Sequence, residues 1–289
     1  MKTITTILAT MMMGFSISAC SINANGNNGI SSKRITASEN YVTKEYKVSD
    51  FNKISLVGSG HVFFTQKAGA PAVSVVTSDN VAEILDVTVE NNTLYLKIKK
   101  GYSVRNIKKL DYTINAAALK EMNISGSGNF KLMNGLNTDE LTLDVTGSGD
   151  MDCNNINCTG NMKATISGSG DIDVANLQCG NLKLAITGSG DIEMKAINAN
   201  DVSASISGSG DIKLSGKATK AGYTVTGSGD ITADGLEAEA VKARTSGSGD
   251  ITCFASQSIE ADRVGSGSIG YKGNPAKVNI SKKGVYTMN

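Results

Sequence analysis

The chain contains no tryptophan, two prolines and a single histidine, and aromatic residues make up 5 % of its 289 residues. Without tryptophan it lacks the best platform on which a sugar ring could stack. A Ser-His-Asp triad or a histidine-ligated zinc site would have to use the one histidine, His61. The net charge of +1 gives no electrostatic case for a nucleic-acid partner. These absences weigh against most catalytic and nucleic-acid-binding classes.

Glycine, by contrast, is abundant, with 32 residues, and it occurs among many isoleucines, valines, threonines, serines and asparagines. This mixture is typical of a β-rich chain with many tight turns. A disordered chain would have fewer β-branched residues and a larger net charge. The composition therefore predicts an all-β protein.

The N-terminus resembles a bacterial lipoprotein signal. Lys2 provides a positive charge, residues 4–17 form an apolar segment too short to span a bilayer, and Ile17-Ser18-Ala19-Cys20 resembles a lipobox. We predict a signal peptide over 1–19 and lipid attachment at Cys20, which would hold the protein on a membrane. The alternative is a plain secretory signal that is cleaved near the same cysteine.

Residues 20–38 are predicted to be a flexible tether, because the segment from Ser21 to Ser32 consists mostly of glycine, asparagine and serine. These twelve residues reach roughly 20 Å. The remaining residues, 39–289, are predicted to form one domain. We divide it into an N-terminal β section over 39–118, regular repeats over 119–271 and a C-terminal cap over 272–289.

The repeats are marked by the motif Ser/Thr-Gly-Ser-Gly-Asp, with looser copies at both ends. The first glycine of each copy is Gly126, Gly147, Gly168, Gly188, Gly208, Gly227, Gly247 or Gly265. Successive copies follow at intervals of about twenty residues, a period that indicates a stacked solenoid. An outlying copy, Gly58-Ser59-Gly60, lies several such periods before Gly126.

Apolar residues occupy fixed positions around each motif. They lie six, four and two residues before the first glycine, and four, six and nine residues after it. The spacing of two is that of a strand with one buried face, and no helical period competes with it. Like positions coincide only if successive repeats lie parallel, about 4.8 Å apart. We therefore predict a parallel β-helix, with the right-handed form favoured, in which each rung has a strand, a Gly-Ser-Gly corner, a second strand and a polar turn such as 198–201.

The N-terminal section is also predicted to consist of strands. The expected elements are strands over 73–77, 85–89, 93–99 and 111–115, a hairpin turn at 90–92 and a short helical turn within 79–85. Six cations lie between Lys97 and Lys109, and we interpret this segment as a solvated loop or edge rather than a binding patch.

Several of these segments resemble one known family. The resemblance is carried by VSDFNKI at 48–54, GSGHVFFTQ at 58–66, NTLYLKI at 92–98, the Gly-Ser-Gly-Asp repeats, and YKGNP at 271–275. Together they resemble the "putative auto-transporter adhesin head" or GIN domain family of secreted Bacteroidetes-type proteins, over about residues 40–289. The resemblance implies an all-β, helix-like solenoid, often behind a lipoprotein signal, and brings no catalytic residues.

The aspartates of the motif are the sharpest candidate site. They are Asp150, Asp171, Asp191, Asp211, Asp230 and Asp250. Stacked one strand spacing apart, they could form a calcium ladder or a pair of hydrolase carboxylates. We favour a third interpretation, in which each carboxylate accepts backbone N–H groups of its own corner. Catalysis requires an acid and a base in unlike environments, and equivalent rungs provide none.

Hydroxyl groups form parallel ladders beside the aspartates. They belong to the Ser or Thr before each corner and to the serine within it, and we interpret them as partners in cross-rung hydrogen bonds. The alternative is a flat array that binds a repetitive ligand such as a glycan or ice.

Four cysteines follow Cys20. Cys153 and Cys253 fall in an inward position and are expected to be core thiols. Cys158 and Cys179 occupy equivalent positions in adjacent rungs, where either a disulfide or simple stacking would fit. His61 replaces the aspartate of the outlying corner and is expected to be a turn residue.

The sequence thus favours a non-enzymatic cell-envelope lipoprotein of the outer membrane, with no cofactor or metal and a β-helical head for adhesion or scaffolding. Its ligand, a protein or a glycan, and the membrane face it occupies are left open. A second hypothesis is a carbohydrate-binding or carbohydrate-active β-helix, which would need an asymmetric cluster of Asp, Arg or Lys, or exposed aromatic residues, on one face. A third is homo-oligomerisation through the open ends of the solenoid.

Overall fold

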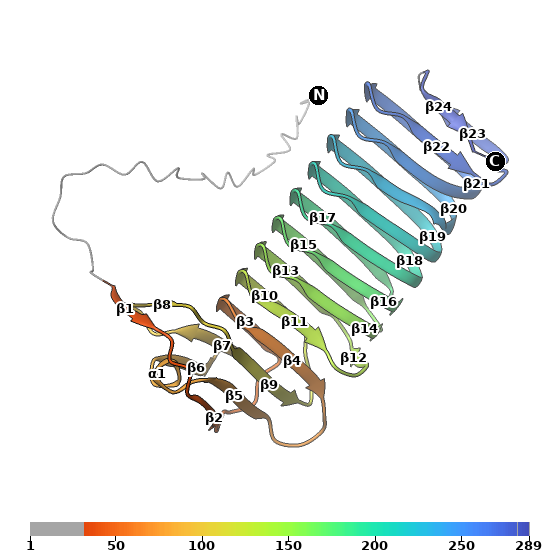
Figure 1. Ribbon diagram of the computed structural model, residues 1–289. Helices are drawn as coiled ribbons and strands as arrows, with labels where there is room; N and C mark the ends of the chain where they lie inside the picture. Colours follow the sequence, from red (N-terminus) through yellow and green to blue (C-terminus); the bar gives the residue numbers. More distant parts are fainter. Residues whose placement is uncertain (1–31, 282, 289) are drawn as a thin grey trace, which may run out of the picture. The chain divides into compact units, whose positions relative to one another are not determined.

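The structure, a computed structural model, describes residues 32–281 and 283–288, so the predicted signal peptide and Cys20 lie outside the described residues. The chain forms an all-β solenoid of stacked parallel strands, as predicted (Figure 1). The one helix among the described residues is α1 (Asp79–Ala82), inside the expected helical turn. The right-handed sense stays a prediction.

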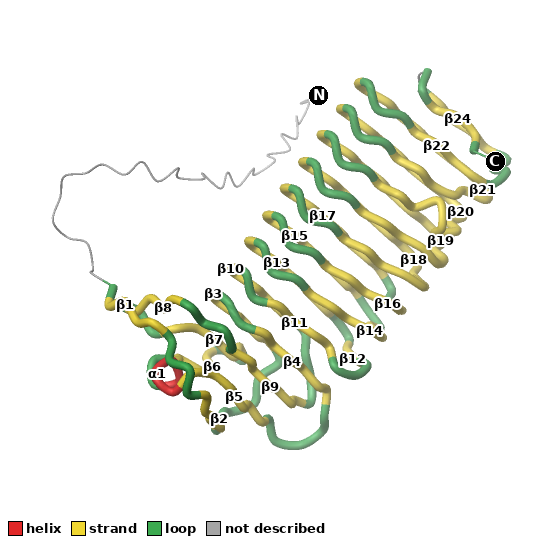
Figure 2. The backbone as a smooth tube through the Cα atoms, in the orientation of Figure 1, coloured by secondary structure: helices red, strands yellow, loops and turns green. Residues whose placement is uncertain are grey.

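Each rung of the solenoid pairs in parallel with the next. The strands of the regular repeats are β10 (Glu121–Gly126), β11 (Asn129–Leu132), β12 (Leu136–Thr138), β13 (Leu141–Gly147), β14 (Met151–Cys158), β15 (Asn161–Gly168), β16 (Ile172–Gln178), β17 (Asn181–Gly188), β18 (Ile192–Gly208), β19 (Ile212–Gly227), β20 (Ile231–Gly247), β21 (Ile251–Gly265) and β22 (Ile269–Lys272). The loops that separate the later long strands are the Gly-Ser-Gly corners, which form a row along one edge (Figure 2). The repeat predicted from the sequence is therefore the structural rung.

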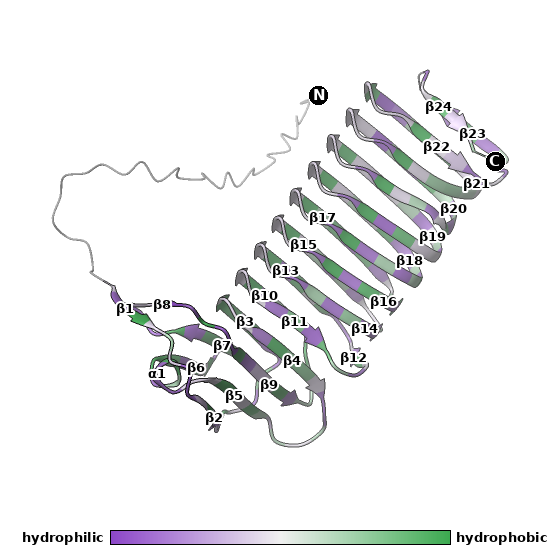
Figure 3. Cartoon of the chain, in the orientation of Figure 1, coloured by the Kyte–Doolittle hydropathy of each residue, from purple (hydrophilic) through white to green (hydrophobic). Residues whose placement is uncertain are grey.

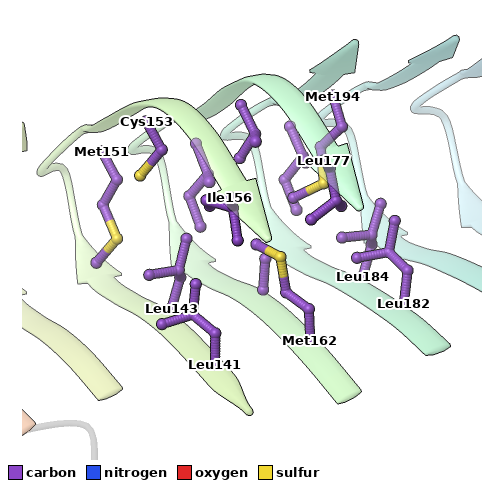
Figure 4. Packing of buried hydrophobic residues seen from close by; sticks show 14 of the residues in the cluster. Leu141, Leu143, Met151, Cys153, Ile156, Met162, Leu177, Leu182, Leu184 and Met194 are labelled. Atoms are coloured by element: carbon purple, nitrogen blue, oxygen red, sulfur yellow. The ribbon is translucent and has the colours of Figure 1, made fainter. Parts of the chain in front are cut away.

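The predicted apolar columns form the core. In β14 the inward residues Met151, Cys153 and Ile156 are at most 3 % exposed, and they pack against Leu141 and Leu143 of β13 (Figure 4). Along each strand hydrophobic residues alternate with polar ones, as Figure 3 shows. The alternation breaks at two outward residues, Asn154 and Asn155, so β14 bends there and each rung has three sides.

The two bends other than the Gly-Ser-Gly corner absorb the varying length of the rungs. The register shifts at the second bend after Met194 and Lys213, and between β20 and β21 it shifts after Ala233 and again after Ala238, at the remaining bend of the rung. The Gly-Ser-Gly corner, in contrast, keeps glycine opposite glycine in every rung. The period of the repeat can therefore vary along the chain without disturbing the corner.

The expected polar turn at 198–201 is not a turn in the structure. It lies inside β18, and its residues remain paired with β19, as Asn198 with Lys217 and Asp201 with Lys220. The prediction was wrong because polar residues indicated a break in the strand. Here they face solvent at a bend, where the pairing with β19 omits Asn200 and resumes at Asp201.

The outlying corner proves to be part of the solenoid. β3 (Lys53–Gly58) and β4 (His61–Gln66) pair in parallel with β10 and β11, so Gly58 lies opposite Gly126. The chain then leaves the solenoid and returns at β10. The long interval between these two corners in the sequence is therefore no gap in the stack, and the solenoid begins inside the section we assigned to 39–118.

The intervening residues close this end of the solenoid. β7 (Thr93–Ile98) and β9 (Leu110–Ala116) lie parallel to β3 and β4 on the other side. β5 (Ala72–Ser78) pairs antiparallel with β9, β2 (Tyr41–Tyr46) with β5, and β6 (Leu85–Glu90) with β7. These strands match those expected from the sequence, and the predicted hairpin turn holds Asn91 and Asn92 at positive φ, as a type I′ turn requires. An antiparallel cap thus covers the first rung.

β1 (Lys33–Thr36) lies within the segment expected to be a tether and pairs in parallel with β8 (Tyr102–Arg105). Its single half-buried apolar side chain, Ile35, makes too short a pattern to stand out from a polar segment. Within residues 32–281 and 283–288, no helix has the length and hydropathy needed to cross a membrane.

The other end of the solenoid is formed by an incomplete turn. β23 (Lys277–Ile280) pairs in parallel with β21, and β24 (Val285–Thr287) with β22. Arg263 occupies a position that is apolar in earlier rungs, and its guanidinium donates hydrogen bonds to the carbonyls of Gly267 and Lys283. Val278 and Ile280 of β23 remain 47 % and 40 % exposed. The hydrogen bonds of Arg263 thus fix the last turn, while the apolar side chains of β23 remain exposed to solvent.

Candidate binding surfaces

The Gly-Ser-Gly corners are held together by backbone hydrogen bonds. Ser189 N–H donates to the carbonyl of Gly168 at 2.8 Å, and Ser209 N–H to that of Gly188 at 2.8 Å, a pattern that continues along the ladder. The third residue, as at Gly190 and Gly210, is buried, and a Cβ atom there would overlap with the glycine carbonyl of the preceding rung. Glycine is required because the backbones approach so closely.

Each aspartate of the column bonds to the following rung. Asp171 N–H donates to Asp150 Oδ1 at 3.2 Å, Asp191 N–H to Asp171 Oδ1 at 2.9 Å, and Asp211 N–H to Asp191 Oδ1 at 2.8 Å. The series continues through Asp230 and Asp250 to Ser268. We expected the carboxylates to accept N–H groups of their own corner. The acceptor role is found, but it links neighbouring rungs, because parallel stacking places the next N–H beside each carboxylate.

The same bond is made by an uncharged residue at the start of the column. Asn129 Oδ1 accepts the N–H of Asp150 at 3.2 Å. We therefore expect Asp211→Asn to keep the bond to Asp230 and to relieve repulsion between adjacent carboxylates, which is about 1 kcal/mol per pair in water. Asp211→Ala relieves the same repulsion but loses the bond, so its free energy of unfolding should be about 1 kcal/mol lower than that of Asp211→Asn.

Urea unfolding of both variants, with and without calcium, checks this expectation. Equal destabilisation by Asn and Ala would contradict the hydrogen-bond role. A stabilisation of the wild type by calcium that Asp211→Asn abolishes would favour the calcium ladder. Among the residues that the structure describes, no group of three or more His, Cys, Asp or Glu side chains is arranged to hold a metal ion.

The hydroxyl ladders lie on the exposed edge beside this column. Thr187 and Ser207, which precede their corners, and Ser189 and Ser209, which lie within them, are all exposed. The cross-rung bonds of the corner pass through backbone groups, so these hydroxyls line a regular, hydrophilic edge. The cross-rung hydrogen bonds that we predicted for these hydroxyls are not formed by Thr187, Ser189, Ser207 or Ser209, whose corners are joined through the backbone. The alternative, that they bind a repetitive ligand, stays a prediction.

The four described cysteines are buried free thiols. Cys153 and Cys253 are in the core, as expected, and burial raises the pKa of each to about 12. Cys158 and Cys179 lie in neighbouring rungs, and burial raises the pKa of Cys179 to about 12, with a smaller contribution from Cys158. Both thiols are thus protonated at neutral pH, and a disulfide between them stays a prediction.

His61 is exposed and is the first residue of β4, immediately after its corner. It lies opposite Asn129 and is therefore at the start of the aspartate column.

Two of the cations between Lys97 and Lys109 form ion pairs with nearby carboxylates. Lys108 pairs with Glu39 at 2.9 Å and Lys97 with Asp86 at 3.5 Å. This is the solvated and paired edge that we expected.

A surface not anticipated from the sequence is a groove of about 910 Å³ along one side of the solenoid. It is lined by three consecutive residues from each of seven rungs: 161–163, 181–183, 201–203, 220–222, 240–242, 258–260 and 277–279. In the first six rungs the central residue is buried, so its two neighbours point outward and flank the groove. We call this surface the lysine groove, for its five lysines: Lys163, Lys183, Lys220, Lys242 and Lys277.

The family can now be assigned. The model of the family described as "Putative auto-transporter adhesin, head GIN domain" matches residues 50–175 and again 161–275. The chain belongs to this family. The two matches overlap at residues 161–175, within the repeats of this GIN-domain protein, so each covers several rungs of the same solenoid. No curated protein matches the sequence.

Solved structures share the fold of this chain. A "putative lipid binding protein" from Parabacteroides distasonis is 29 % identical, with a TM-score of 0.63 over 89 % of this chain and 100 % of the other. A "putative adhesin" from Parabacteroides merdae is 25 % identical, with a TM-score of 0.68 over 89 % and 99 %. A "putative adhesin" from Parabacteroides distasonis, at 24 % identity and a TM-score of 0.69 over 88 % and 99 %, shows the same fold.

Proposed function

We propose that this GIN-domain protein is a non-enzymatic lipoprotein of the outer membrane, anchored through Cys20, whose β-helical head serves adhesion or scaffolding. The observation that carries the proposal is the equivalence of the aspartates. From Asp171 to Asp250 each carboxylate makes the same bond to the next rung, so the members of this column do not differ from one another as the acid and base of a hydrolase must. Membership of a family described as adhesin heads supports this role.

A long and rigid head suits such a role. Nine corners, from Gly58 to Gly265, stack in one register, which corresponds to eight spacings or roughly 38 Å. Repeated equivalent rungs present the same groups at regular intervals, which favours contact with an extended or repetitive partner.

Protease treatment of intact cells, together with palmitate labelling, tests the proposal. We expect the wild type to be labelled and to be degraded without cell lysis, and Cys20→Ser to lose the label. Full protection of a labelled protein would place the head in the periplasm and would overturn the adhesin role. The absence of label from the wild type would overturn the lipid anchor.

Carbohydrate binding is a second candidate, and the lysine groove is the observation that favours it. We expected such a function to need an asymmetric cluster of charged residues on one face, and the five lysines provide one. Aromatic residues are scarce, so recognition would depend on charge and hydrogen bonds rather than on ring stacking.

We also propose that the uncovered end mediates self-association. β23 has exposed Val278 and Ile280 on a strand with a free edge, and such edges pair readily with other strands. Light scattering during size exclusion is expected to give a dimer at high concentration, and Val278→Lys/Ile280→Lys to give a monomer. A wild type that remains monomeric would contradict this.

A further inference from the structure

The lysine groove runs along the solenoid rather than across it. It spans seven rungs, or six spacings, roughly 29 Å. Its volume of about 910 Å³ is therefore spread over a long and narrow channel. A ligand that fills it must be extended and must lie parallel to the solenoid axis.

The charge of the groove selects the ligand further. Its five lysines face two acidic residues, Asp201 and Glu260, which leaves an excess of three positive charges. Lys242 pairs with Glu260 at 3.0 Å, and Lys163 pairs with Asp144 outside the groove at 3.4 Å. Within residues 32–281 and 283–288, Lys183, Lys220 and Lys277 form no ion pair. Their charges are free to meet a polyanion.

The positions of the lysines along the solenoid axis also restrict the ligand. Lys163, Lys183, Lys220, Lys242 and Lys277 lie on the first, second, fourth, fifth and seventh rungs of the groove. The three that form no ion pair, Lys183, Lys220 and Lys277, are therefore separated by two and then three rungs, roughly 10 Å and 14 Å. Between the lysines, side-chain amides and hydroxyls are available, such as Asn161, Asn181 and Ser203. Charges at intervals with polar groups between them match a polymer whose repeating unit contains both acids and hydroxyls.

Other extended ligands fit less well. A peptide strand could not extend the sheet here, because the backbone groups of these strands already pair with the rungs on both sides. Single-stranded nucleic acids are bound largely through aromatic stacking, and the groove has no aromatic residue. An acyl chain could contact the apolar stems of these side chains, but it would leave the ammonium groups of Lys183, Lys220 and Lys277 without a partner.

We propose that the lysine groove binds a linear acidic polysaccharide, extended along the solenoid, with Lys183, Lys220 and Lys277 binding its carboxylate or sulfate groups. This deepens the proposed adhesive role by naming a ligand class, and it rests on that role only for its biological setting.

The test measures binding of the purified full-length chain to polygalacturonate, with neutral dextran and phosphatidylglycerol vesicles as competing probes. We expect polygalacturonate to bind, dextran not to bind, and Lys183→Gln/Lys220→Gln to weaken polygalacturonate binding about tenfold or more. The matched control, Lys47→Gln/Lys67→Gln, removes the same charge from exposed lysines outside the groove. It should change the Kd less than about twofold.

Equal weakening by the two double variants would overturn the groove, because it would indicate non-specific attraction. Equal binding of dextran, or stronger binding of the vesicles that the groove variant abolishes, would overturn the acidic polysaccharide. Thermal unfolding of each variant confirms that the fold is intact. If polygalacturonate fails to bind while cells that carry the protein still adhere to a surface, the ligand class is wrong and the adhesive role stands. Protection of the head in intact cells would count against the adhesive role alone.

Discussion

Gly210→Ala is expected to lower the free energy of unfolding by about 4 kcal/mol or more. A Cβ atom at Gly210 would overlap with the carbonyl oxygen of Gly190 in the preceding rung. This obstacle is backbone rather than the mobile tip of a side chain, so the rungs would have to separate. Separation would stretch the corner bonds, such as Ser209 N–H to the carbonyl of Gly188 at 2.8 Å. Urea unfolding followed by circular dichroism, with limited proteolysis for local opening, measures the loss.

Gly222→Ala is the matched control. Gly222 is in β19 of the same solenoid, but no heavy atom lies within 4 Å of the position of an added Cβ. The change should stay within about 0.5 kcal/mol, because it removes unfolded-state entropy without a clash. An equal effect of the two variants would mean that glycine content, and not the close approach at the corner, determines stability.

The regular part of this fold could be predicted from the sequence because two signals coincide there. The glycine ladder fixes where each rung turns, and apolar columns such as Ile172, Ile192 and Ile212 fix which side faces the core. In a parallel stack each residue lies beside its counterpart one period away, so periodicity along the chain translates directly into contacts. The pairing of strands in successive rungs could be predicted from the sequence only because of this periodicity.

The N-terminal rung could not be placed in this way. Its corner at Gly58 is followed by strands that cap the solenoid, and no period connects Gly58 with Gly126. The lysine groove was missed for a related reason. Its lysines are divided between two outward positions, with 163, 183 and 242 on one side and 220 and 277 on the other, so they form no single column in the sequence. The partner of each aspartate was misassigned because the sequence does not show whether a carboxylate points to its own corner or to the next.

The contact between β4 and β11, the first two rungs of the solenoid, is expected to contribute strongly to stability. Phe64→Ala is expected to lower the free energy of unfolding by about 4 kcal/mol. Phe64 is fully buried in β4, and its ring centroid lies 6.3 Å from that of Phe130 in β11, although the whole N-terminal cap separates the two in the chain. Removal of the ring leaves a cavity between the first two rungs, which the surrounding backbone cannot close. Urea unfolding and thermal melts measure the loss.

Phe63→Ala is the matched control, since Phe63 is adjacent in the same strand but points to the opposite, partly exposed face. It should lose about 1 kcal/mol or less. A double-mutant cycle with Phe64→Leu and Phe130→Leu should give a coupling energy of about 0.5–1.5 kcal/mol, because the two rings are in contact. Additive single effects would show that β4 does not stack on β11. The first corner would then lie outside the solenoid, and the head would be one rung shorter.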